Sequence, residues 1–214
     1  MRYFKKGREP SSLTKEKRDG AVIFGNLSGS CKSDLRMALL RDQGNLCCYC
    51  MQRISDNPTG VKIEHRRSQS EFQALQLDWN NLLAACLGGQ GKPPTEQHCD
   101  TCKGDRSIVL DPTKHIIDDQ VEYSADGRVV ADDRTLDREL DEVLGLNRKF
   151  LCNNRRAKLD GVIEAMTHRS PGRWSTRMLQ KKIRDLQTPK DGDLPEYLGV
   201  VVWWIRKKLT SIRL

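Results

Sequence analysis

The chain has 214 residues, of which 37% are hydrophobic and 31% charged, and 37 lysines and arginines against 29 acidic residues give a formal net charge of +8. This length fits one domain with an appendage, and the composition does not resemble that of a disordered chain. No apolar run approaches the roughly 20 residues of a membrane-spanning helix, and the basic N-terminus lacks the apolar stretch of a secretory signal. We therefore expect a cytoplasmic protein, and the positive charge favours a polyanionic partner, either nucleic acid or an acidic membrane surface.

Residues 1–32 are predicted to form a basic, irregular arm. Pro10 and Gly29 interrupt this stretch, and its apolar residues are sparse and follow no clear period. A short helix is expected next, because apolar residues recur at helical spacing. Ser33 is its predicted N-cap and Gly44 its predicted end.

A strand and an insertion are predicted further along. A turn is expected over 57–60, followed by a strand over 61–65, where apolar and polar residues alternate. Residues 79–86 are apolar after their asparagines, and residues 87–97, rich in glycine and proline, predict a flexible insertion.

The composition shifts after Pro112. We expect a hairpin whose strands lie near 121–123 and 128–130, then four helices, the last over 197–209. The apolar stripes of the first three helices are Leu136, Leu140, Val143 and Leu144; Leu151, Leu159, Val162, Ile163 and Met166; and Met178, Ile183 and Leu186.

The eight cysteines indicate metal ligands and buried thiols rather than disulfides, since the expected compartment is reducing. Cys47-x-x-Cys50 has the spacing of a zinc knuckle, in which both thiolates reach one ion at about 2.3 Å. The sequence leaves two choices for the other pair of zinc ligands. Cys99 and Cys102 have the better local spacing, whereas Cys86 with Cys99 requires the insertion to loop out. Either pairing predicts structural Zn²⁺, and neither by itself indicates catalysis.

Polar residues between the cysteines add a second pattern. Glu64-His65 places a carboxylate beside an imidazole at a strand end, Asn81 follows, and Asp100 and Lys103 form a Cys-Asp-x-x-Lys string. In this order the motifs resemble those of the HNH endonucleases. They are most similar to the HNH component of Septu-type and retron-associated anti-phage defence systems (PtuB-like), over roughly half of the chain.

The resemblance implies an α+β fold, with a zinc-stabilised ββα-metal (HNH) core and a mostly α-helical C-terminal region. The arm would then span 1–32, the nuclease core with its zinc site 33–115, and the hairpin with the helical region 116–214, where a partner docks or substrate is guided. In this branch the insertion lies between the third and fourth zinc ligands. That placement favours one zinc set: Cys47, Cys50, Cys86 and Cys99.

The same resemblance implies a role for each site residue. His65 is the expected general base, and Glu64 and Asp100 are the expected ligands of catalytic Mg²⁺ or Mn²⁺. Asn81 is expected to fix the loop that aims His65. Because Asp100 replaces the histidine of most HNH proteins, His98 is an alternative ligand. Phosphate contacts are expected from nearby basic residues: Lys103, Arg66 and Arg67.

These features predict a metal-dependent endonuclease that hydrolyses phosphodiester bonds, with DNA favoured and RNA such as tRNA also open. The resemblance implies an ATPase partner subunit (PtuA-like) and, in retron-associated systems, a reverse transcriptase with its RNA–DNA. Two other classes remain open: a zinc-ribbon nucleic-acid-binding module without catalysis, and a structural assembly subunit. Neither of them requires the Glu64-His65 doublet.

Overall fold

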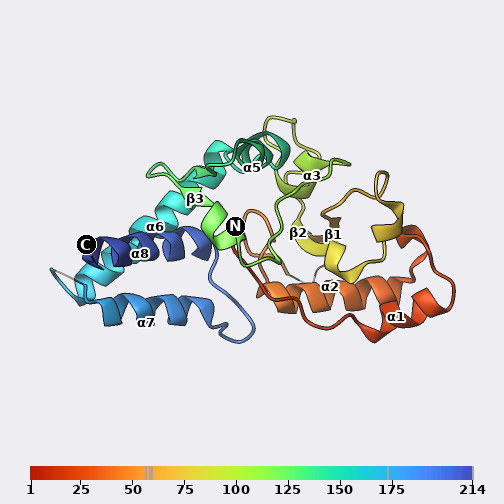
Figure 1. Cartoon of the computed structure of the whole chain (residues 1–214), viewed down its shortest axis with the longest axis horizontal. Helices are drawn as coiled ribbons and strands as arrows, with labels where there is room; N and C mark the ends of the chain where they lie inside the picture. Colours follow the sequence, from red (N-terminus) through yellow and green to blue (C-terminus); the bar gives the residue numbers. More distant parts are fainter. Residues whose placement is uncertain (56, 58–59, 173, 214) are drawn as a thin grey trace.

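The computed structural model describes residues 1–55, 57, 60–172 and 174–213, and its first half combines helices with a two-stranded sheet. The elements of this half are α1 (Ser11–Arg18), η1 (Phe24–Asn26), α2 (Gly29–Gln43), β1 (Val61–His65), η2 (Gln73–Leu75), η3 (Trp79–Asn81), β2 (Leu82–Cys86) and α3 (Cys99–Lys103). Those of the second half are α4 (Ile117–Gln120), β3 (Glu122–Tyr123), β4 (Val129–Val130), α5 (Arg134–Arg138), the π-helical turn η4 (Glu139–Val143), α6 (Lys149–Arg169), α7 (Thr176–Gln187) and α8 (Leu198–Arg213). Figure 1 places the β1–β2 sheet towards one end of an elongated molecule and α6 to α8 at the other. The expected α+β class is confirmed.

The sheet that carries the candidate site is the antiparallel pair β1–β2. Its register runs from Val61 opposite Cys86 to His65 opposite Leu82, so the predicted strand over 61–65 is confirmed. β2 is buried along nearly its whole length, as expected for a strand covered on both faces. Helix α2 packs against both strands and α3 against β2. Of the predicted turn over 57–60, residues 58 and 59 lie outside the described residues.

Helix α2 supports the sheet and is longer than predicted. It ends as expected at Gly44, whose φ of 62° is a left-handed conformation that glycine adopts without strain. Its beginning was predicted wrongly at Ser33. The Ser28 hydroxyl accepts a hydrogen bond from the Cys31 amide at 3.1 Å, so this serine is the N-cap. The helix therefore begins five residues earlier than predicted, within the segment expected to be an irregular arm.

The N-terminal arm is not irregular, which corrects the expectation for residues 1–32. It contains α1 and η1, and Leu13 is fully buried. The backbone amide of Phe4 donates to the Pro112 carbonyl at 2.9 Å, and the Met1 terminus contacts the Tyr123 hydroxyl. The buried apolar residues of the arm, among them Phe4, Leu13 and Leu27, lie far apart in the sequence, whereas Val22 and Ile23 are exposed, so the arm shows no period. The three domain boundaries themselves stay a prediction.

The second half follows the predicted order. β3 and β4 form the expected antiparallel hairpin, and helices occupy all four predicted places. The apolar stripe predicted for α7 was wrong at one position: Met178 is 40% exposed, whereas its neighbour Leu179 is fully buried. Leu179, Ile183 and Leu186 recur at i, i+4 and i+7, the spacing of one helix face.

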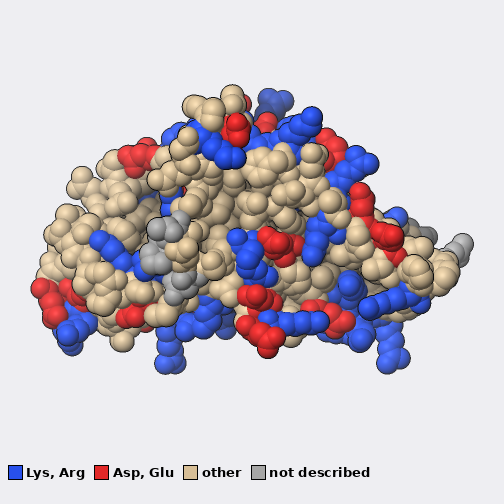
Figure 2. Space-filling view, turned by 180° about the vertical axis from the view of Figure 1, so that it is seen from behind, with Lys and Arg blue, Asp and Glu red and all other residues tan. Residues whose placement is uncertain are grey.

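On the face shown in Figure 2, charges of both signs are mixed. In the view of Figure 2, Lys and Arg side chains alternate with Asp and Glu side chains. The net charge of +8 therefore does not by itself identify a surface that binds a polyanion. Among the described residues, no helix combines the length and apolar character needed to cross a membrane.

Candidate metal centre and active site

Four cysteine thiols gather where the knuckle before β1, the end of β2 and the start of α3 meet. The Sγ atoms of Cys47, Cys50, Cys86 and Cys99 all lie within 4.8 Å of one another. Two of their separations are 3.8 Å, between Cys47 and Cys99, and 3.7 Å, between Cys50 and Cys86. A tetrahedral ZnS₄ centre with bonds of about 2.3 Å has edges of about 3.8 Å. Both the donor set and its spacing therefore fit Zn²⁺.

The local backbone explains this convergence. The knuckle closes through hydrogen bonds between Cys47 and Gln52 and between Met51 and Cys47, and Met51 takes a φ of 65°. The 87–97 insertion loops out as the alternative required, because the His98 amide bonds back to the Gly88 carbonyl at 2.9 Å. This loop brings the end of β2 to the start of α3.

Cys102 was the alternative zinc ligand and His98 the alternative ligand of the catalytic ion. The structure places neither of them in that position. Cys102 lies outside the thiol cluster, with its Sγ 3.9 Å from the Glu142 carbonyl oxygen. His98 is buried with Nδ1 3.1 Å from the Cys99 Sγ, so it adjoins the thiols and does not line the carboxylate pocket. Of the two zinc sets, the structure brings together the one that contains Cys86.

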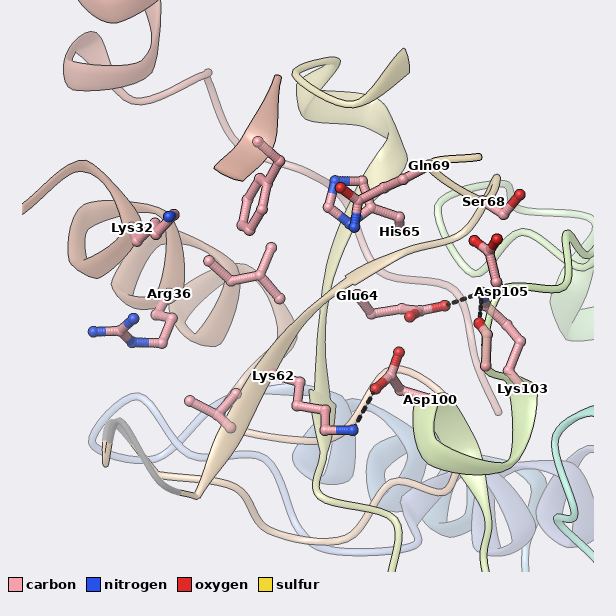
Figure 3. A pocket seen from close by; sticks show the side chains of 14 residues that line it. Lys32, Arg36, Lys62, Glu64, His65, Ser68, Gln69, Asp100, Lys103 and Asp105 are labelled. Atoms are coloured by element: carbon pink, nitrogen blue, oxygen red, sulfur yellow. Dashed lines mark hydrogen bonds and ion pairs between the residues drawn. The ribbon is translucent and has the colours of Figure 1, made fainter. Parts of the chain in front are cut away.

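An open pocket of about 380 Å³ lies beside the cluster, between β1, α2 and α3. Figure 3 shows Glu64 and Asp100 near its centre, His65 above them, and the basic side chains of Lys32 and Arg36 across from them on α2. The remaining lining includes residues from the loop after β1 and the end of α3: Ser68, Gln69, Lys103, Gly104 and Asp105. The three residues expected to perform catalysis thus share one pocket.

Glu64 is a buried carboxylate held by two donors. Its Oε1 accepts the Tyr49 hydroxyl at 2.8 Å and lies 3.2 Å from the Lys103 ammonium. The side chains of Glu64 and Lys103 are each only 2% exposed. Burial raises the pKa of Glu64 well above its ordinary value, and a hydrogen bond with Asp100 adds to this, against the opposing charge of Lys103. Burial also raises the pKa of Tyr49, so the phenol keeps its proton and donates.

Asp100 is the second carboxylate, on the first turn of α3. Its Oδ2 lies 2.8 Å from the Lys62 ammonium, which also donates to Thr101. Burial acts to raise the pKa of Asp100, but hydrogen bonds with Glu64 and Lys62 and nearby positive charge outweigh it and leave the pKa below its ordinary value. Two adjoining carboxyl groups at an open pocket are the oxygen donors that Mg²⁺ or Mn²⁺ prefers, so these residues fit such an ion.

His65 has the tautomer that a base needs. Its Nε2 lies 3.0 Å from the Gln76 carbonyl oxygen, which only accepts, so Nε2 carries the hydrogen and Nδ1 is the basic nitrogen. The ring also packs edge-on against Phe24, with 4.8 Å between ring centroids. Burial lowers the pKa of His65, which leaves the imidazole neutral at pH 7.

Asn81 clamps the loop that follows His65. Its side-chain Oδ1 accepts the Arg67 amide at 2.8 Å, and its Nδ2 donates to the carbonyls of Arg67 and Leu75 at 3.0 and 3.1 Å. Its own carbonyl accepts the Arg66 amide at 3.1 Å. These bonds fit the expected positioning task, since they hold both the exit from β1 and the segment that leads to Gln76.

The three residues expected to bind phosphate are engaged elsewhere. Lys103 is buried against Glu64, and Arg66 lies 3.5 Å from Asp111 while donating to the Ile108 carbonyl. Arg67 lies over the Phe72 ring at 5.3 Å. Neither arginine lines the pocket, and their phosphate contacts stay predictions.

Sequence reasoning missed other residues of this site. Lys32 and Arg36 line the pocket at i, i+4 on α2, but the helix was predicted to begin after Ser33, so Lys32 was assigned to the arm and the shared face was missed. Lys62 and Tyr49 contact the two carboxylates, and the only signal for them was their position within the strand and the knuckle. Their contacts depend on tertiary packing.

Comparisons with known proteins cover only part of the chain. No family model matches it. Over 103 residues, 44% of this chain and 38% of the relative, it is 27% identical to the Septu protein PtuB of Bacillus thuringiensis. The predicted resemblance is confirmed, as a distant and partial one. Over 79 residues, 32% of this chain and 31% of the relative, it is 34% identical to the candidate HNH endonuclease of retron Ec83 of Escherichia coli. The chain thus spans less than two fifths of the length of either.

Proposed function

We propose that the chain is a metal-dependent HNH endonuclease that hydrolyses phosphodiester bonds. The observation that carries this proposal is the convergence of Glu64, His65 and Asp100 on one pocket beside a four-thiol cluster. The distant similarity to PtuB and to the retron Ec83 protein supports it. In this account the thiols hold structural Zn²⁺ and clamp β1, β2 and α3 as a ββα-metal core.

Glu64 and Asp100 bind a Mg²⁺ or Mn²⁺ ion through their carboxylate oxygens. When bound, the ion supplies positive charge that stabilises the scissile phosphate and the leaving 3′ oxygen. His65 accepts a proton from the attacking water at Nδ1, while its Nε2–H stays on the Gln76 carbonyl and fixes the ring. The water oxygen bonds to phosphorus, the P–O3′ bond breaks, the leaving 3′ oxygen takes a proton from solvent to become a hydroxyl, and a 5′ phosphate remains. Asn81 keeps the loop after β1 in place.

Substrate contacts come from the face of the pocket opposite the carboxylates. Lys32 and Arg36 line the pocket from α2, and we assign them to backbone phosphates. Such contacts carry no base information, so the site reads the sugar–phosphate backbone. Duplex DNA is the favoured substrate, and structured RNA is the alternative that the assay below separates.

The similarity to the Septu protein PtuB also supports a role in a defence system of the Septu kind, together with an ATPase subunit. The helical second half, α6 to α8, is the proposed docking region, since it lies at the far end of the molecule from the pocket (Figure 1). A retron reverse transcriptase with its RNA–DNA is a further proposed partner, based on the similarity to the retron Ec83 protein.

The test is cleavage of plasmid DNA and of total RNA by the wild-type chain, alone and with a candidate ATPase subunit. His65→Ala is expected to lower the rate at least about 100-fold, because it removes the general base. His168→Ala, an exposed histidine on α6, is the matched control and should cut like the wild type. If wild type and His65→Ala behave alike with intact zinc, the chain is a non-catalytic zinc-binding nucleic-acid module or assembly subunit.

A further inference from the structure

Tyr49 lies between two cysteines of the thiol cluster and contacts a residue of the pocket. It occupies the knuckle between Cys47 and Cys50, and its side chain is fully buried. Its hydroxyl donates to Oε1 of Glu64 at 2.8 Å. The knuckle therefore extends a rigid side chain from the four-thiol cluster to the carboxylate on β1.

We propose that Tyr49 is a positioning residue, through which the four-thiol cluster fixes the Glu64 carboxylate for the divalent ion. This inference rests on the proposed function, because it takes Glu64 as a ligand of that ion. It assigns the knuckle a second task besides holding the fold together.

The geometry at Glu64 supports this task. Tyr49 and Lys103 both act on Oε1, so neither of them uses the second oxygen of the carboxylate. A tyrosine side chain has only two rotatable torsions to the ring and hydroxyl, and the thiols that flank Tyr49 anchor its backbone, so its hydroxyl is held in one place against Glu64. A buried carboxylate with one donor fewer also loses part of the stabilisation that replaces its lost hydration.

The opposite side of the pocket is anchored in the same way. Asp100 directly follows Cys99, another member of the cluster. Both carboxylates are thus connected to the thiol cluster. Asp100 is the chain neighbour of Cys99, and Glu64 accepts a hydrogen bond from Tyr49, the chain neighbour of Cys50. Removing that hydroxyl loosens one ligand and leaves the other in place.

The experiment compares zinc-loaded wild type with Tyr49→Phe, which keeps the ring and removes only the hydroxyl. Mn²⁺ affinity is measured by electron paramagnetic resonance without nucleic acid, together with zinc content. Tyr49→Phe is expected to bind Mn²⁺ about 10- to 100-fold more weakly, the usual loss when a partner of a metal ligand is removed. Its zinc content is expected to equal that of the wild type. Tyr123→Phe is the matched control, because it removes another buried hydroxyl, one that bonds to Met1.

A third variant separates the inference from the function on which it rests. If Glu64→Gln abolishes Mn²⁺ binding while Tyr49→Phe binds like the wild type, the positioning role is refuted and the proposed function stands. If Glu64→Gln binds Mn²⁺ like the wild type, the assignment of Glu64 as a ligand fails as well. Loss of zinc from Tyr49→Phe also contradicts the inference, since the hydroxyl would then serve folding.

Discussion

Glu64 and His65 are consecutive residues of a strand, so their side chains leave its opposite faces. Both nevertheless line the pocket, because β1 crosses it and Phe24 and Gln76 close around the imidazole on its own side. The carboxylate of Glu64 and the imidazole of His65 thus reach the same pocket from opposite faces of the strand. This arrangement lets burial depress the pKa of His65 while Glu64 keeps its two donors.

The residues that were found from the sequence and those that were missed differ in kind. Glu64, His65 and Asp100 were singled out because their chemistry is unusual and their order resembles a known family. Tyr49 escaped notice because its role depends on reaching a carboxylate 15 residues away across the fold. A buried contact between two elements has no local sequence pattern.

At the same scale, Lys32 and Arg36 make a prediction about nucleic-acid binding. In a His65→Ala background, which prevents cleavage, changing both to glutamine should weaken binding and reduce the salt slope of log K by about 1 for each lost phosphate contact. Fluorescence anisotropy of a labelled duplex over a salt series measures both quantities.

Arg41→Gln is the matched control for that pair, because Arg41 lies on the same helix with a side chain 70% exposed beside Asp42. It should leave the slope close to that of the parent. Equal slopes for the Lys32/Arg36 double variant and its parent would show that α2 does not contact phosphate.

At the scale of elements, three pieces of chain meet at the four thiols. The knuckle comes from the segment between α2 and β1, Cys86 ends β2, and Cys99 begins α3. Local spacing favoured Cys102 as a ligand, because it completes a second Cys-x-x-Cys. The structure instead places the Cys102 Sγ 3.9 Å from the Glu142 carbonyl oxygen, outside the thiol cluster. The resemblance to HNH proteins, rather than spacing, selected the cluster that forms.

Cys86→Ala and Cys102→Ala therefore form a matched pair. The first removes a thiol from the cluster and is expected to lower zinc content and the melting temperature together, because metal binding and folding are coupled in such sites. The second should keep both at the wild-type values. Metal analysis and thermal unfolding of the purified variants decide between them, and zinc loss confined to Cys102→Ala would contradict the assignment.

At the scale of the whole molecule, the N-terminal segment connects the two halves. Phe4 bonds to Pro112, and Met1 lies against Tyr123 of β3, so residues read as a loose arm contribute to the core. The order of elements was predictable, because hairpin and helix patterns are local. The packing of the arm was not, since its buried apolar residues are scattered and follow no local period.

For the chain as a whole, we have proposed that it cuts a phosphodiester backbone with a divalent ion held by Glu64 and Asp100. The most direct measurement incubates the zinc-loaded chain, with a candidate ATPase subunit present, on plasmid DNA and on total RNA in Mg²⁺, Mn²⁺ or EDTA, beside Glu64→Gln. Our account predicts cutting in Mg²⁺ or Mn²⁺, none in EDTA or with Glu64→Gln, and products that carry 5′ phosphates. Cutting that persists in EDTA or in Glu64→Gln, or no cutting of either substrate by the wild type, would contradict it.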